Sequence, residues 1–121
     1  MIIRVPKRAK EPSPSHARAK VQERKTAERI GGKVTKGSGN KDEKGDVRVR
    51  GFIRVECKTT KNSSFSVSVA LIEKLEAAVF GVGEIPFFEV ELELGKHTAV
   101  VMPRYALDQI LELLEAHRAD R

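Results

Sequence analysis

Apolar and polar residues alternate along two neighbouring stretches in the middle of the chain, residues 46–50 and 53–58. Gly51 lies in the short bend between them, and this combination predicts a β-hairpin. Successive side chains of a strand point to opposite faces of the sheet, so each stretch has one apolar and one polar face. The apolar faces, which require a core, comprise Val47, Val49, Ile53, Val55 and Cys57.

The register of this hairpin follows from its apolar faces. If those faces are to coincide, Val47 must pair with Val55, and Asp46 then lies opposite Glu56. Directly opposed residues have Cβ atoms roughly 5 Å apart, and like charges placed there repel each other. A hard divalent cation such as Mg²⁺ takes oxygen ligands and would satisfy both carboxylates. Lys58 follows two residues after Glu56 and shares its face.

The same register sets Arg48 opposite Arg54 on the polar face. This pair of like charges requires an anion, and a phosphate group is the expected one. A solvated, charge-rich hairpin is the plain alternative for all these residues, because Asp and Glu-x-Lys at this spacing occur by chance in many proteins. The hairpin context favours a functional site.

The rest of the chain divides into helical and extended stretches. Apolar spacing of three or four predicts helices, two-residue alternation predicts strands, and Gly or Pro marks their ends. The expected helices span residues 16–30, 68–80 and 103–117, and the further expected strands span residues 33–35, 86–94 and 98–102. Residues 36–44 are rich in glycine, asparagine and charge, which predicts a loop.

Three expectations about burial and capping follow from these elements. Ser15 is the expected N-cap of the first helix, which has only an incomplete apolar stripe. The last helix is expected to bury Leu107, Ile110, Leu111 and Leu114. The glutamates of the strand at residues 86–94 are expected to form a solvated face that keeps DNA away: Glu89, Glu91 and Glu93.

Composition narrows the class of protein. The 121 residues are typical of one domain, with residues 1–15 as a basic, flexible arm and residues 16–121 as the folded part. The formal net charge of +6 is typical of proteins that bind polyanions. No apolar run predicts a membrane span or a signal peptide, so we expect a cytoplasmic protein without a membrane partner. Cys57 is the sole cysteine, which excludes an intrachain disulfide and a cysteine zinc cluster.

Asp46, then Glu56-Cys57-Lys58 on the next strand, resembles the PD-(D/E)xK nuclease superfamily, with Gly45 in place of the usual Pro. The order of the preceding motifs is similar to that of the archaeal-type Holliday junction resolvases and their phage relatives. Those motifs are Gln22-Glu23, Gly31-Gly32, Gly37-Ser38-Gly39 and Lys44-Gly45-Asp46, and the resemblance covers roughly residues 20–88.

The resemblance implies an α/β fold with a central mixed five-stranded sheet flanked by helices, as in restriction endonucleases. It implies an endonuclease that holds Mg²⁺, or Mn²⁺ as a substitute, through Asp46, Glu56 and the carbonyl of Cys57. Lys58 would orient the attacking water. A further carboxylate from the first helix would be Glu23, with Glu28 as the rival position.

The implied substrate is branched double-stranded DNA, cut by paired symmetric nicks at a four-way junction. Two symmetric cuts require two sites, so a homodimer is implied. The expected DNA contacts are Ser38, Lys41, Arg48, Arg54, Thr59 and Lys61, and Phe52 or Phe65 is a candidate wedge or dimer contact. The alternatives are another nuclease of this superfamily, of nicking or restriction type, a non-catalytic DNA-binding module, and an RNA-associated basic protein.

Overall fold

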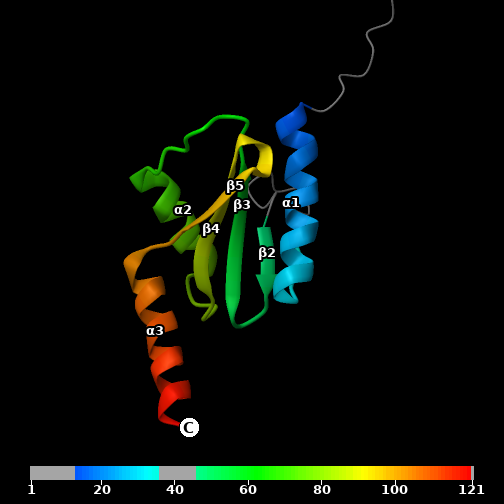
Figure 1. Ribbon diagram of the computed structural model, residues 1–121. Helices are drawn as coiled ribbons and strands as arrows, with labels where there is room; N and C mark the ends of the chain where they lie inside the picture. Colours follow the sequence, from blue (N-terminus) through cyan, green and yellow to red (C-terminus); the bar gives the residue numbers. More distant parts are fainter. Residues whose placement is uncertain (1–12, 36–45, 121) are drawn as a thin grey trace, which may run out of the picture.

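The computed structural model describes residues 13–35 and 46–120, with the side chain of Asp46 outside the description. It confirms the predicted fold class, an α/β arrangement in which helices flank a mixed five-stranded sheet (Figure 1). The helices are α1 (Pro14–Ile30), α2 (Val69–Val79), the short 3₁₀ helix η2 (Glu93–Gly95) and α3 (Arg104–Ala119). The strands are β1 (Lys33–Val34), β2 (Asp46–Val49), β3 (Ile53–Thr59), β4 (Ile85–Leu92) and β5 (His97–Val101).

The strands lie in the sheet in the order in which they occur in the chain. Strands β1, β2 and β3 are antiparallel neighbours, β3 and β4 are parallel, and β5 returns antiparallel to β4. The one parallel pair is connected through α2, as a parallel pair requires a long crossover. The predicted hairpin register is confirmed, because Asp46 pairs with Glu56 and Val47 pairs with Val55.

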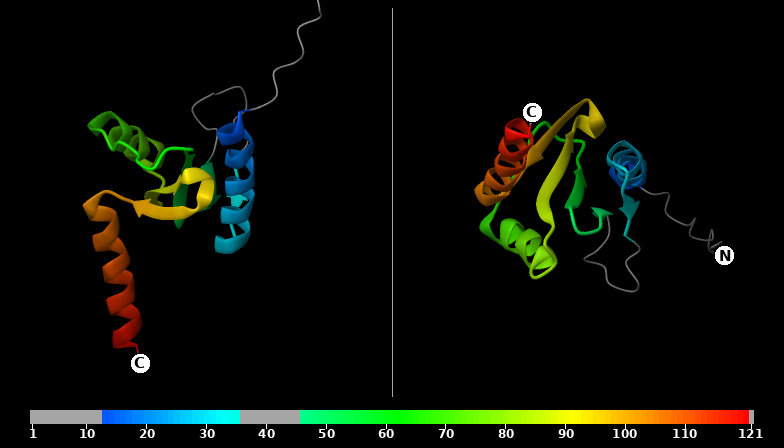
Figure 2. Two further views of the ribbon diagram at one scale, coloured as in Figure 1. Left: turned by 45° about the horizontal axis from the view of Figure 1, so that its top comes forward. Right: turned by 90° about the horizontal axis from the view of Figure 1, so that it is seen from below.

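Each face of the sheet carries its own apolar core. On the α1 face, Val47, Val55 and Cys57 are buried and pack against Ala27 and Ile30. On the opposite face, Leu75 of α2 packs with Phe88 and Val90 of β4. Since Glu56 and Lys58 alternate with Val55 and Cys57 along β3, they belong to the face that carries α2. Figure 2 shows the sheet between α1 and the other two helices.

Helix α1 begins two residues earlier than predicted. Ser13, not Ser15, is its N-cap, and the Ser13 hydroxyl accepts a hydrogen bond of 3.2 Å from the backbone N–H of His16. Pro14 occupies the first turn, where the missing N–H costs nothing. Of the predicted basic arm, residues 1–12 lie outside the described ranges, and the remainder leads into or belongs to this helix.

The prediction that Glu89 and Glu91 face solvent is wrong. They are only 3% and 5% exposed, because α1 covers that face of β4 with polar side chains. Only Glu93 is exposed, at the start of η2. The polar stripe of α1 therefore faces β4, while Ala27 and Ile30 of its incomplete apolar stripe pack on β2 and β3.

The prediction for the last helix is also wrong. Leu107, Leu111 and Leu114 are about half exposed, Ile110 is partly buried, and Ala106 is fully buried. The reason is geometric, because α3 is buried only at its first turn, then borders an open groove beside the start of β3 and β4, and finally runs beyond the ends of the strands (Figure 1). No helix in the described ranges combines the length and apolar character needed to cross a bilayer.

Candidate active site

The centre of the candidate site is the non-apolar face of the β2–β3 hairpin. The backbone pairs Asp46 directly with Glu56, as predicted. The Glu56 side chain is buried at 7% exposure, so it lies within the fold rather than on a solvated strand face. This excludes the plain alternative of a fully solvated hairpin for Glu56.

Lys58 is the neighbour that neutralises this carboxylate. Its Nζ lies 2.9 Å from Glu56 Oε1, while its own side chain stays partly open to solvent. The β3–β4 register sets Phe88 beside Glu56 and Val90 beside Lys58. An apolar wall lowers the local dielectric constant, which strengthens the attraction between the two charges and makes an unpaired charge there costly.

Glu23 is partly buried on α1, and α1 covers the face of the sheet opposite to Glu56 and Lys58. Burial raises the pKa of Glu23, and the nearby positive charges of Lys20 and His16 offset part of that rise. The rival position, Glu28, is exposed on the same helix. A carboxyl group that is easier to protonate than usual is better suited to acid–base work, so these environments favour Glu23.

The structure describes two of the three predicted metal ligands completely, Glu56 and the carbonyl of Cys57, and only the backbone of Asp46. Among the described side chains, no three His, Cys, Asp or Glu residues gather closely enough to hold a metal ion. The predicted ligand set is Asp46, Glu56 and the carbonyl of Cys57, and the first of these lies outside that search. The Cys57 side chain itself is buried, in agreement with a structural thiol.

The expectation that Arg48 and Arg54 require a phosphate needs correction. They do oppose each other, but Glu84 at the start of β4 supplies the negative charge. Arg48 Nε donates to both carboxylate oxygens of Glu84, at 2.9 and 2.7 Å, and the Gly51 N–H donates to one of them at 2.9 Å. The Glu84 side chain is fully buried and Arg54 is buried as well. Arg48 is therefore already paired within the chain, and Arg54 is buried.

Two of the remaining predicted DNA contacts, Thr59 and Lys61, lie in the segment after Lys58. Lys61 is exposed, as a phosphate contact requires. The Thr59 hydroxyl donates to Glu91 Oε1 at 3.4 Å, so it already has a partner within the chain. Ser38 and Lys41 lie outside the described residues. Phe65, a candidate wedge, packs instead against the core beneath α2.

A network around the buried glutamates of β4 was missed by sequence reasoning. Glu91 binds Arg18 of α1 through two hydrogen bonds of 2.7 and 2.8 Å, which raise the pKa of Arg18. Glu89 accepts from Thr26 at 2.9 Å and from Arg29 at 2.7 Å. A signal was present, since polar residues at helical spacing form one stripe of α1: Arg18, Gln22, Thr26 and Arg29.

The same network connects α1 with the chain that follows Lys58. The Thr60 N–H donates to the Glu91 carbonyl at 3.0 Å, and the Leu94 N–H donates to the Thr60 carbonyl at 2.9 Å. Glu93 and Leu94 hold left-handed backbone conformations, with φ of 49° and 56°, which are strained for residues other than glycine. These contacts fix the position of the exit from β3 relative to the helix that carries Glu23.

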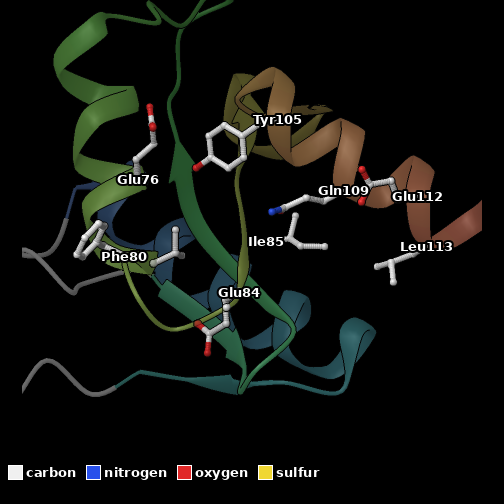
Figure 3. Close-up of a pocket in the computed structure, with 10 residues that line it drawn as sticks. Glu76, Phe80, Glu84, Ile85, Tyr105, Gln109, Glu112 and Leu113 are labelled. Carbon is white, nitrogen blue, oxygen red and sulfur yellow. The ribbon is translucent and has the colours of Figure 1, made fainter.

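A cavity of about 550 Å³ lies elsewhere, between the end of α2, the start of β4 and the start of α3 (Figure 3). Its lining includes three carboxylates, Glu76, Glu84 and Glu112, beside the phenol of Tyr105. Burial, and to a smaller extent Glu76, raises the pKa of Tyr105. Glu84 is already paired with Arg48, so Glu76 and Glu112 give the lining its negative charge, which disfavours phosphate.

No protein-family model, curated protein or solved structure matches this chain. Its residues and their geometry therefore carry the functional argument.

Proposed function

We propose that this protein is a Mg²⁺-dependent, structure-selective DNA endonuclease that resolves four-way junctions by paired nicks. The observation that carries the proposal is the pairing of Asp46 with Glu56, with Lys58 held 2.9 Å from the Glu56 carboxylate on the same face. Two acids and a lysine on adjacent strands form the constellation that the resemblance to the resolvases requires.

The donor groups suit a hard cation. Carboxylate oxygens at positions 46 and 56 and the carbonyl of Cys57 are oxygen ligands, which Mg²⁺ and Mn²⁺ prefer. Mg²⁺ bound there would supply Lewis-acid activation of a phosphate oxygen and of a water molecule. Glu56 is buried beside apolar residues, so its charge requires compensation, which Lys58 supplies in the described part of the chain and a bound cation would increase.

The roles of the side chains follow from their environments. Lys58, held by Glu56 but partly open to solvent, would orient the attacking water and neutralise charge that develops on the phosphate. Glu23, with its raised pKa, would hold a proton to higher pH than an ordinary carboxyl group. Lys61 and the net charge of +6 would attract the DNA backbone.

The decisive experiment incubates the purified protein and Mg²⁺ with labelled four-way junction, nicked, linear and single-stranded DNA. Paired symmetric nicks in the junction alone are the expected result. Cleavage of every substrate would indicate a general nuclease, and binding without cleavage would indicate a DNA-binding module. Either result overturns the proposal.

Variants connect the activity to the site. Lys58→Met is expected to reduce the cleavage rate by about 100-fold or more, the range of a positioned proton-transfer or charge-stabilising group. Glu56→Gln should abolish both cleavage and Mn²⁺ uptake measured by calorimetry. Glu73→Gln on the exposed surface of α2 is the matched control and should change neither. Equal activity of Glu56→Gln and the control would contradict the assignment.

A further inference from the structure

Helix α3 exposes a row of leucine side chains to solvent. It contains 16 residues, and Ala106 is its only buried one. The exposed fractions are 44% for Leu107, 51% for Leu111, 53% for Leu113 and 54% for Leu114. Exposed apolar surface on this scale marks an interaction site in a folded protein.

A groove runs beside the same helix. Ile110, Leu113 and Leu114 form its α3 wall, and its other lining residues come from the hairpin and β4: Phe52, Ile53, Ile85 and Phe87. Its volume is about 300 Å³, enough for more than one leucine side chain. The surface thus offers a projecting row and an apolar groove side by side. An apolar groove offers nothing to a phosphate backbone, so DNA is not its occupant.

We propose that a second copy of this chain covers this surface, with the two α3 helices antiparallel across a twofold axis. A twofold interface uses the same patch on both copies and must be complementary to itself. An antiparallel pair of α3 helices meets that condition, because the leucine row of each copy packs against the leucine row of the other and the two grooves lie beside it. The inference does not rest on nuclease activity, although two joined copies would supply the two sites that paired nicks require.

The spacing along α3 fits this arrangement. Leu107, Leu111 and Leu114 follow at four and three residues, so they form one stripe along the helix. An antiparallel pair that sets Leu107 opposite Leu114 of the second copy brings each Leu111 near the twofold axis. The interface then contains matching leucines from both copies.

The charged residues beside the leucine stripe also favour a second copy of the chain as the partner of this surface. Arg104 and Glu115 lie on the same edge of the leucine stripe, eleven residues apart, which is about three helical turns. The antiparallel register brings Arg104 of one copy within about 3 Å, along the axis, of Glu115 of the other. Symmetry produces this ion pair twice. Glu115 now contacts Arg118 at 3.2 Å, an exposed pair that is easily exchanged.

The available area predicts a dimer of modest affinity. The four leucines together with the half-exposed Phe52 leave on the order of 500 Å² of apolar surface per copy, somewhat below the ~800 Å² of a standard interface. Side-chain contacts along the groove add to this. We therefore expect a dissociation constant in the range of roughly 1–100 µM.

Light scattering coupled to size-exclusion chromatography tests the proposal. The full chain, at roughly 1 to 500 µM, is expected to change from monomer to dimer mass without DNA or metal. Leu111→Glu and Leu114→Glu should remain monomeric with unchanged circular dichroism. Val69→Glu is the control, because Val69 is 74% exposed on α2, and it should still form dimers.

A charge exchange tests the register and the identity of the partner. Arg104→Glu and Glu115→Arg are each expected to weaken dimerisation about tenfold, and the double variant should restore it, since only a second copy carries both exchanges. A monomer at every concentration, a dimer that persists in Leu111→Glu, or a double variant weaker than both single variants would overturn the proposal. These masses are measured without a cleavage assay, so a failed nuclease test leaves the result intact.

Discussion

Helices α1 and α3 are almost equal in length, with 17 and 16 residues, yet they meet the rest of the molecule in opposite ways. Helix α1 has a polar inner stripe and lies against the sheet through buried ionic contacts. Helix α3 is rich in leucine and leaves most of that apolar surface in water. The comparison shows that burial depends on what lies opposite a helix, because Glu89 and Glu91 of β4 require cations, whereas Leu113 and Leu114 of α3 border an open groove beside β3 and β4.

The largest expected effect is that of Arg18→Leu. Arg18 and Glu91 form the better buried of the two α1 ion pairs, with side-chain exposures of 26% and 6%. Removing the guanidinium leaves Glu91 with the Thr59 hydroxyl as its side-chain partner among the described residues. We expect a loss of about 3 kcal/mol in the free energy of unfolding, typical of a buried charge deprived of its partner. Urea denaturation at low protein concentration measures it.

Two further substitutions in α1 show how the loss of stability depends on the burial of the arginine. Arg29→Leu should cost only about 1 kcal/mol, because Arg29 is 60% exposed and Glu89 keeps its hydrogen bond to Thr26. Arg24→Leu, on the exposed face, should change the stability by less than about 0.5 kcal/mol. Equal effects of all three would show that α1 is not held by its buried ion pairs.

Gly95→Ala is expected to have the next largest effect. Gly95 has φ of +100°, and a Cβ atom there would lie 2.6 Å from Arg18 Nη2. Backbone strain and the displaced guanidinium should together lower the stability by about 1–2 kcal/mol. Gly81→Ala provides the contrast, since it shares the positive φ but meets no atom within 4 Å. A Gly95 variant no less stable than the Gly81 variant would contradict the close approach of Arg18.

Leu111→Ala tests whether the exposed leucines of α3 contribute to the stability of the single chain. In a core, this truncation would cost about 2–5 kcal/mol. Because Leu111 is half exposed in the single chain, we expect less than about 0.5 kcal/mol when unfolding is measured on the monomer. The loss should grow with protein concentration if α3 pairs as proposed. A large, concentration-independent loss would place Leu111 in a core of the monomer.

Glu23→Gln should have the smallest effect on stability, and the size of this effect depends on pH. Burial raises the folded-state pKa of Glu23 above its ordinary value of about 4.5, so the folded state holds this proton more tightly than the unfolded state. The resulting stability is complete below that value and is lost as the pH rises through the raised pKa. The neutral glutamine avoids this loss, so the variant should unfold at a slightly higher temperature than the parent at neutral pH.

This advantage should disappear at about pH 4, where Glu23 is protonated in both states. Junction cleavage should decrease in the same variant, since stability and activity oppose each other at many functional positions. A variant that is less stable than the parent at neutral pH would contradict the assigned environment of Glu23.

The hairpin at the centre of the candidate site was predictable from sequence because its apolar residues leave only one register. Pairing Val47 with Val55 was enough to set Asp46 opposite Glu56. The alternation of apolar and polar residues in these two strands is sufficient to predict their register. The short range of the contact, rather than any property of the acids, made the prediction possible.

The partners of Glu89 and Glu91 could not be predicted from alternation. Alternation shows that Glu89 and Glu91 share a face, but not which helix covers that face, because Arg18 lies 73 residues from Glu91 in the chain. Leucine spacing likewise identified the apolar stripe of α3 without showing how little of the molecule lies opposite it. Glu84, which pairs with Arg48 across 36 residues, is a third contact of this kind.

The single cysteine gives this molecule a built-in chemical reporter. Cys57 is buried in the core beneath α1, so a thiol reagent reaches its sulfur only when the helix lifts from the sheet or the whole chain unfolds. The labelling rate in native buffer therefore measures how often that separation occurs, with no engineered probe. The frequency with which α1 separates from the sheet can thus be measured in the unmodified chain.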